Sequence, residues 1–90
     1  MPTVENMVNR NGNPVPNQFL IYTDEGVVFQ SYSSVVAFRN RKGEVVLDEN
    51  KWNYSKTTGI YRNQFLREGI ADTRKKIESG VYKLDNLNAF

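Results

Sequence analysis

The sequence predicts a small α+β domain in which an antiparallel sheet of four to five strands packs against two short C-terminal helices. Short β-rich runs separated by turn residues fill the middle of the chain, and helical patterns with capping residues follow them. A length of 90 residues is enough for one small core. A hydrophobic content of 39% with 24% charged residues is typical of a folded globular chain.

Residues 1–16 are expected to form an irregular N-terminal arm, and residues 17–90 a single α+β domain. The arm combines several asparagines with Gly12, Pro14 and Pro16, so it mixes turn formers with residues that lack a backbone donor. No internal repeat and no linker long enough to separate two domains is found.

Four strands are predicted as two hairpins that form an antiparallel meander. Asp24–Gly26 and Arg39–Gly43 supply the turns. The strands are predicted at residues 19–22, 27–29, 35–38 and 44–47, with a last strand at 81–84 after the helices. Because apolar side chains occupy both sides of the second strand, the sheet needs cover on each face or presents one face to a partner.

The first predicted helix begins after a cluster of possible N-caps and runs to Glu68, where Gly69 ends it. Tyr61 and Phe65 stand four residues apart and share one side of this helix. The candidate caps are Ser55, Thr57 and Thr58.

A second, shorter helix is predicted from a cap at Asp72 or Thr73 to Ser79, with Gly80 as its stop signal. Ile70 and Ile77 would align on its inner side. The residues that follow the last strand, 85–90, are expected to form a polar tail.

The chain contains no cysteine and no histidine, which excludes Ser-His-Asp and Cys-His nucleophiles, thiolate or imidazole zinc sites and redox dithiols. Asp48 and Glu49 are a poor Mg²⁺ site because adjacent strand residues point to opposite faces. We therefore expect no enzyme activity, no metal and no cofactor. No apolar run is long enough to span a bilayer and no signal-peptide pattern is found, so a cytoplasmic location is expected.

The net charge of +2 conceals an uneven distribution along the chain. Residues 1–45 hold four basic and four acidic residues. Residues 51–76 hold seven basic residues and two acidic ones, a net charge of +5. A second basic group, Arg39–Lys42, lies at a predicted hairpin tip, and the sequence leaves open whether it joins the first.

Aromatic residues are interleaved with the basic residues of this segment, and the combination suits phosphate neutralisation with base stacking. The candidate phosphate contacts are Lys56, Arg62, Arg67, Arg74 and Lys75, the candidate stacking residues are Trp52, Tyr54 and Tyr61, and Asn63 offers an amide to base edges or backbone. The alternative interpretation is structural: the basic residues lie on the solvated faces of two helices, and the aromatic residues pack on the sheet.

A helix-turn-helix interpretation is also open, with Thr73–Lys76 leading a recognition helix. In that interpretation Ile77 is the main apolar residue that packs the helix against the rest of the domain, and one such residue is little support for a recognition helix. The alternative is a helical hairpin that closes the sheet.

The segment Trp52–Leu66 reads Trp-Asn-Tyr-Ser-Lys-Thr-Thr-Gly-Ile-Tyr-Arg-Asn-Gln-Phe-Leu. Together with residues 17–23, 28–32, 46–49 and 73–84, it resembles a small family of unknown function found in bacteriophages and other mobile elements. The resemblance covers most of the chain after residue 16. It implies no activity and no catalytic residues, and a phage setting favours host manipulation or genome handling over metabolism.

The leading hypothesis is a non-catalytic accessory binding module of a phage or mobile element that contacts DNA or RNA through its basic helical face, in the host cell cytoplasm. The alternative is a protein-binding module that inhibits a host protein or serves as a small structural or accessory phage protein. An unpaired edge strand would also permit a homodimer.

Overall fold

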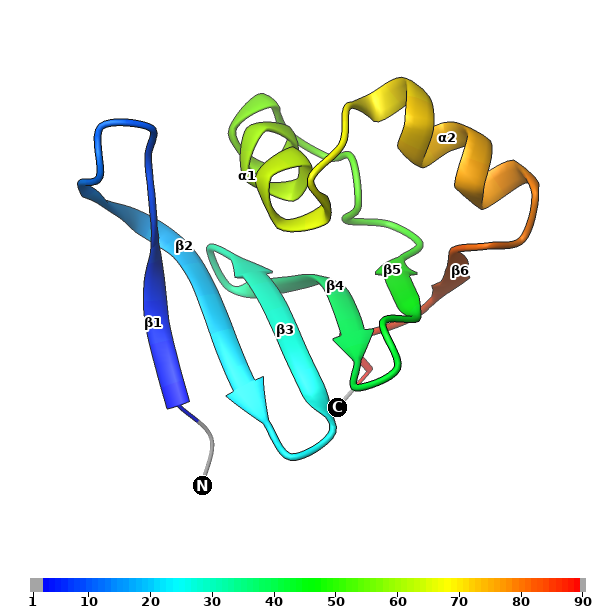
Figure 1. Cartoon of the computed structure of the whole chain (residues 1–90), viewed down its shortest axis with the longest axis horizontal. Helices are drawn as coiled ribbons and strands as arrows, with labels where there is room; N and C mark the ends of the chain where they lie inside the picture. The colour runs from blue at the N-terminus through cyan, green and yellow to red at the C-terminus, as the bar shows by residue number, and fades with distance from the viewer. Residues whose placement is uncertain (1–2, 90) are drawn as a thin grey trace.

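The computed structural model describes residues 3–89 and contains one six-stranded sheet whose strands lie side by side in chain order (Figure 1). The strands are β1 (Thr3–Val8), β2 (Pro14–Thr23), β3 (Gly26–Ser31), β4 (Ser34–Asn40), β5 (Val45–Asp48) and β6 (Lys83–Asp85). Two helices, α1 (Lys56–Leu66) and α2 (Ile70–Glu78), lie between β5 and β6 in the chain. The predicted α+β class is confirmed, with one strand more than expected. None of the helices within residues 3–89 is long and apolar enough to cross a membrane.

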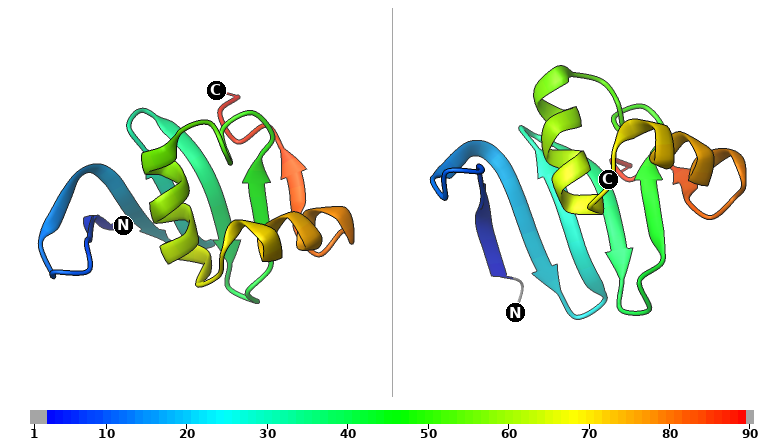
Figure 2. Two further views of the ribbon diagram at one scale, coloured as in Figure 1. Left: turned by 90° about the horizontal axis from the view of Figure 1, so that it is seen from above. Right: turned by 45° about the horizontal axis from the view of Figure 1, so that its top comes forward.

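Strands β1 to β5 form an antiparallel meander, whereas β6 pairs with β5 in parallel. The parallel pair arises because the chain passes through both helices before it returns to the sheet. Both helices lie over the same face of the sheet (Figure 2). The core fills the space between this face and the helices, and its buried apolar residues are Met7, Phe29, Val36, Ala37, Val45, Leu47, Tyr61, Phe65, Leu66 and Tyr82.

The prediction of an irregular arm over residues 1–16 is wrong for residues 3–16, because they form β1, a turn and the start of β2. The Asn9 side chain accepts hydrogen bonds from the backbone N–H groups of Asn11 and Asn13 and so closes the turn. Pro14 and Pro16 are tolerated because pairing between β2 and β3 begins only at Gln18. Residues 1 and 2 of the predicted arm, and residue 90 of the predicted tail, lie outside the described residues.

Helix α1 is fixed to the sheet at both of its ends. Ser55 is its N-cap and accepts a hydrogen bond from the Thr58 N–H, and the buried Thr58 hydroxyl lies 2.8 Å from that of Ser31 on β3. Near the C-terminal end the Phe65 ring stacks on Phe29, with 5.8 Å between ring centroids. The position of α1 therefore follows from one polar and one aromatic contact with the same strand.

Helix α2 begins at Ile70, two residues before the predicted cap, with Gly69 at the N-cap position. Thr73 cannot act as a cap because its side chain is buried, donating a hydrogen bond to the Glu68 carboxylate. Ile77 packs against the core as predicted, and Ile70 is half-buried. The strand predicted at 81–84 is present but shifted, since β6 spans Lys83–Asp85.

Candidate nucleic-acid interface

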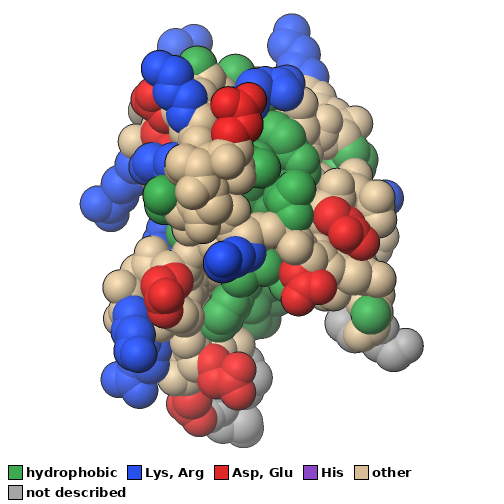
Figure 3. Space-filling view, turned by 90° about the vertical axis from the view of Figure 1, so that its right-hand side faces the viewer, with side chains coloured by type: hydrophobic (Ala, Val, Ile, Leu, Met, Phe, Trp, Pro, Cys, Tyr) green, Lys and Arg blue, Asp and Glu red, His purple; other side chains and the backbone are tan. Residues whose placement is uncertain are grey.

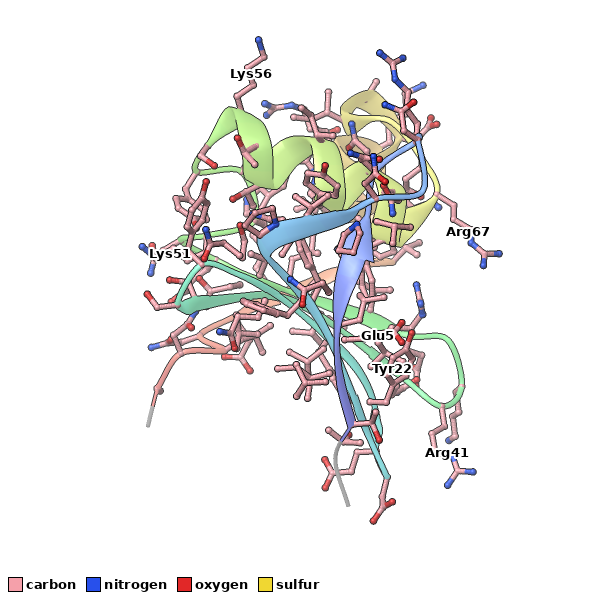
Figure 4. All side chains as sticks on the ribbon, turned by 90° about the vertical axis from the view of Figure 1, so that its left-hand side faces the viewer. Glu5, Tyr22, Arg41, Lys51, Lys56 and Arg67 are labelled. Atoms are coloured by element: carbon pink, nitrogen blue, oxygen red, sulfur yellow. The ribbon has the colours of Figure 1, made fainter. Side chains whose placement is uncertain are left out.

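Four of the predicted phosphate contacts are exposed on the helical layer. Lys56 is the first residue of α1, Arg67 is its C-cap, and Arg74 and Lys75 lie on α2. Among the described residues no carboxylate lies within 4 Å of any of the four, since the one ion pair at that distance joins Lys76 to Glu68. Lys56 and Arg67 stand at opposite ends of α1 and point into solvent (Figure 4). The four charges are thus spread along the layer rather than gathered at one point.

The prediction that Arg62 contacts phosphate is wrong, because its side chain is buried and only 1% exposed. The guanidinium donates hydrogen bonds to the carbonyl oxygen of Trp52 and to the side-chain oxygens of Asn53 and Asn63, at 2.8 to 3.0 Å. Burial, with Arg74 nearby, lowers the pKa of Arg62 below its ordinary value. Arg62 is therefore a structural tie between α1 and the loop before it.

Asn63 and Trp52 take part in the same tie. Asn63 is half-buried, and its amide oxygen accepts the hydrogen bond from Arg62, so this oxygen is occupied inside the fold. Trp52 is half-buried against the core, and the guanidinium carbons of both Arg62 and Arg74 lie 5.5 Å from its ring centroid. Of these two cations only Arg74 is exposed, so Trp52 shares its surroundings with one cation that a ligand can reach.

The other two aromatic candidates differ in exposure. Tyr61 is buried in the core, so the prediction that it stacks on a base is wrong. Tyr54 is 39% exposed, and its hydroxyl donates to the Ser31 carbonyl oxygen at 3.3 Å, which fixes the ring. Lys51 Nζ lies 4.9 Å from the Tyr54 ring centroid. Tyr54 with Lys51 is therefore an aromatic and cationic pair at the surface, next to the N-terminus of α1.

Glu68 is the hub that joins α1, α2 and the segment before β6. Its carboxylate accepts hydrogen bonds from Thr73 Oγ1, Lys76 Nζ and the Tyr82 hydroxyl. Burial alone would raise the pKa of Glu68, but these three donors outweigh it and lower the pKa below its ordinary value. Because Thr73 is buried and Lys76 is paired, neither is free to read bases at the start of a recognition helix, and the helix-turn-helix interpretation is wrong for both residues.

The second basic group does not extend the surface around Lys56. Arg39 is half-buried: its guanidinium donates to the Phe65 carbonyl oxygen and lies 4.3 Å from the Phe65 ring centroid. Arg41 and Lys42 are exposed at the tip between β4 and β5, and Arg41 lies at the end of the molecule remote from Lys56 (Figure 4). Arg41 is therefore separated from Lys56, whereas Arg39 reaches the C-terminal end of α1.

The acidic pair Asp48 and Glu49 is not arranged to hold a cation. Asp48 is buried, and its carboxylate accepts hydrogen bonds from the backbone N–H groups of Asn50, Lys51 and Leu87. Within residues 3–89 no three His, Cys, Asp or Glu side chains are grouped as metal ligands require. Asp48 instead ties the chain after β6 to the loop that follows β5.

The sequence did not identify one feature and left a second one open. Lys51 was counted among the basic residues, but its contact with Tyr54 depends on the loop conformation. The other feature is the face of the sheet opposite the helices, where apolar side chains remain accessible; the signal for it was the run of apolar residues on both sides of the second predicted strand.

Comparison with known proteins shows that a family model described as a family of unknown function (DUF8033) matches residues 3–81. The chain belongs to this family. The DUF8033 match begins at β1 and continues through α2, so the N-terminal hairpin is part of the family domain rather than an arm attached to it. No curated protein and no solved structure matches the chain.

Proposed function

We propose that the protein is a non-catalytic accessory binding module, encoded by a phage or mobile element, that contacts nucleic acid through the helical layer. The observation that supports this proposal is the set of exposed bases without a carboxylate partner: Lys56, Arg67, Arg74 and Lys75. Glu68, which lies between the helices, is held by three donors within the fold. Asp72 and Glu78 on α2 form no ion pair within 4 Å among the described residues. Uncompensated cations favour a polyanion, whose phosphates release counterions when they are neutralised.

The spacing of these basic residues favours an extended ligand. Helix α1 has 11 residues, so its two ends are about 15 Å apart at a rise of about 1.5 Å per residue. One small anion cannot contact Lys56 and Arg67 together, whereas a nucleic-acid strand, with a phosphate about every 3.4 Å along the axis of a duplex, can. Tyr54 beside Lys51 offers an exposed ring on which a base can stack.

Binding should be measured by fluorescence anisotropy with labelled 20-mers of single-stranded DNA, duplex DNA and single-stranded RNA in increasing salt. Four phosphate contacts predict a log-log salt slope of about −3 for a single strand. The variants Lys56→Gln and Arg74→Gln should each reduce the slope by about 0.7. The single tryptophan, Trp52, provides a second readout, because a ligand that reaches Arg74 should change its emission.

The matched control is Arg41→Gln, which removes one exposed charge at the remote hairpin tip. Affinity that falls equally in this control would indicate nonspecific attraction to net charge. Absence of binding to all three probes at low salt would refute the proposal.

The second candidate is a protein-binding module that inhibits a host protein or serves as an accessory phage component. The open apolar face of the sheet favours it, because exposed apolar surface with few charges is typical of a protein interface. Affinity purification from host lysate with and without nuclease distinguishes the two candidates. One stoichiometric protein that persists after nuclease treatment would favour the second.

A further inference from the structure

The face of the sheet opposite the helices carries a continuous row of apolar residues. Register pairing joins one residue from each strand: the apolar row is Val4, Ile21, Val28, Phe38 and Val46, and Lys83 follows it at the β6 edge. Residues paired directly across strands lie on the same face. Because Phe29 points toward α1, its neighbour Val28 and the whole row point away from the helices.

This face is accessible to solvent across its width. Val4 is 60% exposed, and the next four residues of the row are half-buried, although all four lie in inner strands of the sheet. Beside the row is a hollow of about 520 Å³. Its lining is apolar apart from a rim at the turn between β2 and β3, and consists of Val28, Val35, Phe38, Leu87, Thr23, Asp24 and Glu25. Figure 3 looks onto the β6 edge of the sheet, where hydrophobic side chains reach the surface among charged ones.

The charges at the margin of this face are arranged at one end of the sheet. Thr23 pairs with Gly26 and Gly26 with Asn40, so the turn between β2 and β3 and the turn between β4 and β5 lie at the same end. The first turn carries Asp24 and Glu25, and the second carries Arg41 and Lys42. All four side chains are exposed, and none forms an ion pair within 4 Å among the described residues.

We propose that the apolar face binds a second copy of this chain, with the two sheets packed face to face about a twofold axis parallel to the strands. Such an axis places β3 over β4 of the other copy and β2 over β5. The acidic turn of each copy then lies over the basic turn of the other, twice in the dimer. A twofold axis across the strands would instead place the acidic turn at the other end of the partner's strands, away from its basic turn, so the charge pattern selects the first arrangement.

The area of the face is sufficient for a specific dimer. Six strands spaced about 4.8 Å apart, with about six residues each at about 3.3 Å, give a footprint of roughly 24 by 20 Å. Covering this footprint on both copies buries on the order of 1,000 Å², the lower limit for a specific interface. Sheets pack about 10 Å apart with strands nearly aligned, so the side chains of the two rows interdigitate. The helical layers remain on the outside, so the dimer does not depend on nucleic-acid binding.

The test is sedimentation velocity of the full chain from roughly 5 to 500 μM. The expected mass rises with concentration to twice the chain mass of 10.4 kDa. The double variant Arg41→Glu with Lys42→Glu should weaken the dimer at least about tenfold, and so should Asp24→Lys with Glu25→Lys. The combination of all four changes restores opposite charges and should return the dissociation constant to within about threefold of the original.

The matched control is Arg67→Glu with Lys75→Glu, which changes the net charge equally but on the helical layer. This control should leave the dimer intact. A chain that stays monomeric at every concentration would overturn the proposal and leave the face to a different protein. A dimer that persists when the charges of either turn alone are reversed would also overturn the proposal, and would point to pairing through the β1 edge.

Discussion

Two adjacent rows of side chains lie on opposite faces of the sheet and differ in their exposure to solvent. Phe29, Ala37 and Leu47 pair across β3, β4 and β5 on the face beneath the helices, and none of them is exposed. The adjacent row, Val28, Phe38 and Val46, is equally apolar but faces away from the helices and stays half-exposed. Apolar character in a strand therefore indicates that cover is needed, while the positions of the helices decide which row receives it.

The sharpest test of this contrast is truncation of one residue from each row. Leu47→Ala should destabilise the fold by about 3 kcal/mol because it leaves a cavity in a packed core. Val46→Ala should cost less than about 1 kcal/mol under dilute conditions, since its side chain is half-exposed. Urea unfolding monitored by circular dichroism measures both. Equal losses at the two positions would mean that both faces are covered in solution.

The next largest change in stability is expected at Arg62, the buried charged residue that holds α1 to the loop before it. Arg62→Met keeps much of the side-chain volume but removes the hydrogen bonds to Trp52, Asn53 and Asn63, so a loss of about 2 kcal/mol is expected. The exposed Arg67→Gln is the control and should change stability by less than about 0.5 kcal/mol. If Arg62→Met weakened nucleic-acid binding without lowering stability, its structural assignment would be incorrect.

A smaller effect of opposite sign is expected at Gln18, on the helix-facing side of β2. Gln18 pairs with Ser31 and is fully buried, yet its amide nitrogen and oxygen form no hydrogen bond with the described residues. Gln18→Met removes this unpaired amide while filling a similar volume, so stability should rise by about 1 kcal/mol. The midpoint of thermal unfolding reports the change, and a loss of stability would show that the Gln18 amide has a partner in solution.

The smallest effect depends on pH and concerns the Glu68 hub. Burial opposes ionisation, but hydrogen bonds from Lys76, Thr73 and Tyr82 lower the pKa of Glu68 in the folded state. The stability gained from this shift is present above the unfolded-state pKa, ordinarily 4.5, and is lost as the pH falls from there through the lower folded-state pKa. The free energy of unfolding, measured with urea at several pH values in this acidic range, should therefore fall less steeply for Glu68→Gln than for the parent. The exposed Glu78→Gln is the control and should follow the parent. The same pH dependence in Glu68→Gln and the parent would contradict the shift.

Local signals predicted much of the fold. Ser55 is the cap of α1, the two central hairpins lie where the turn residues indicated, and Ile77 faces the core. The N-terminal hairpin was missed because its asparagines and prolines resemble a loop, while the hydrogen bonds from Asn11 and Asn13 to Asn9 that close its turn are visible only in three dimensions.

The candidate site was less predictable than the fold. A basic residue is expected at the surface, and no local pattern distinguishes Arg62, which is buried, from Arg67, which is exposed. The difference arises from the side of α1 on which each residue lies. Arg62 lies on the side that meets the loop carrying Trp52, where carbonyl and amide oxygens accept the hydrogen bonds that water would accept at the surface. The sequence showed where positive charge is concentrated, but only packing showed which charges a ligand can reach.

The parallel pairing of β6 with β5 also has a consequence for the order of assembly. Each of the other pairs joins strands that follow one another in the chain, so short loops close them. The contact between Val46 and Lys83 closes a loop that contains both helices. Long-range pairing of this kind bears the greater entropy cost before its contacts form. We therefore expect the meander to form before β6 pairs with it, so the β6 edge should be the last part of the sheet to gain protection from hydrogen exchange.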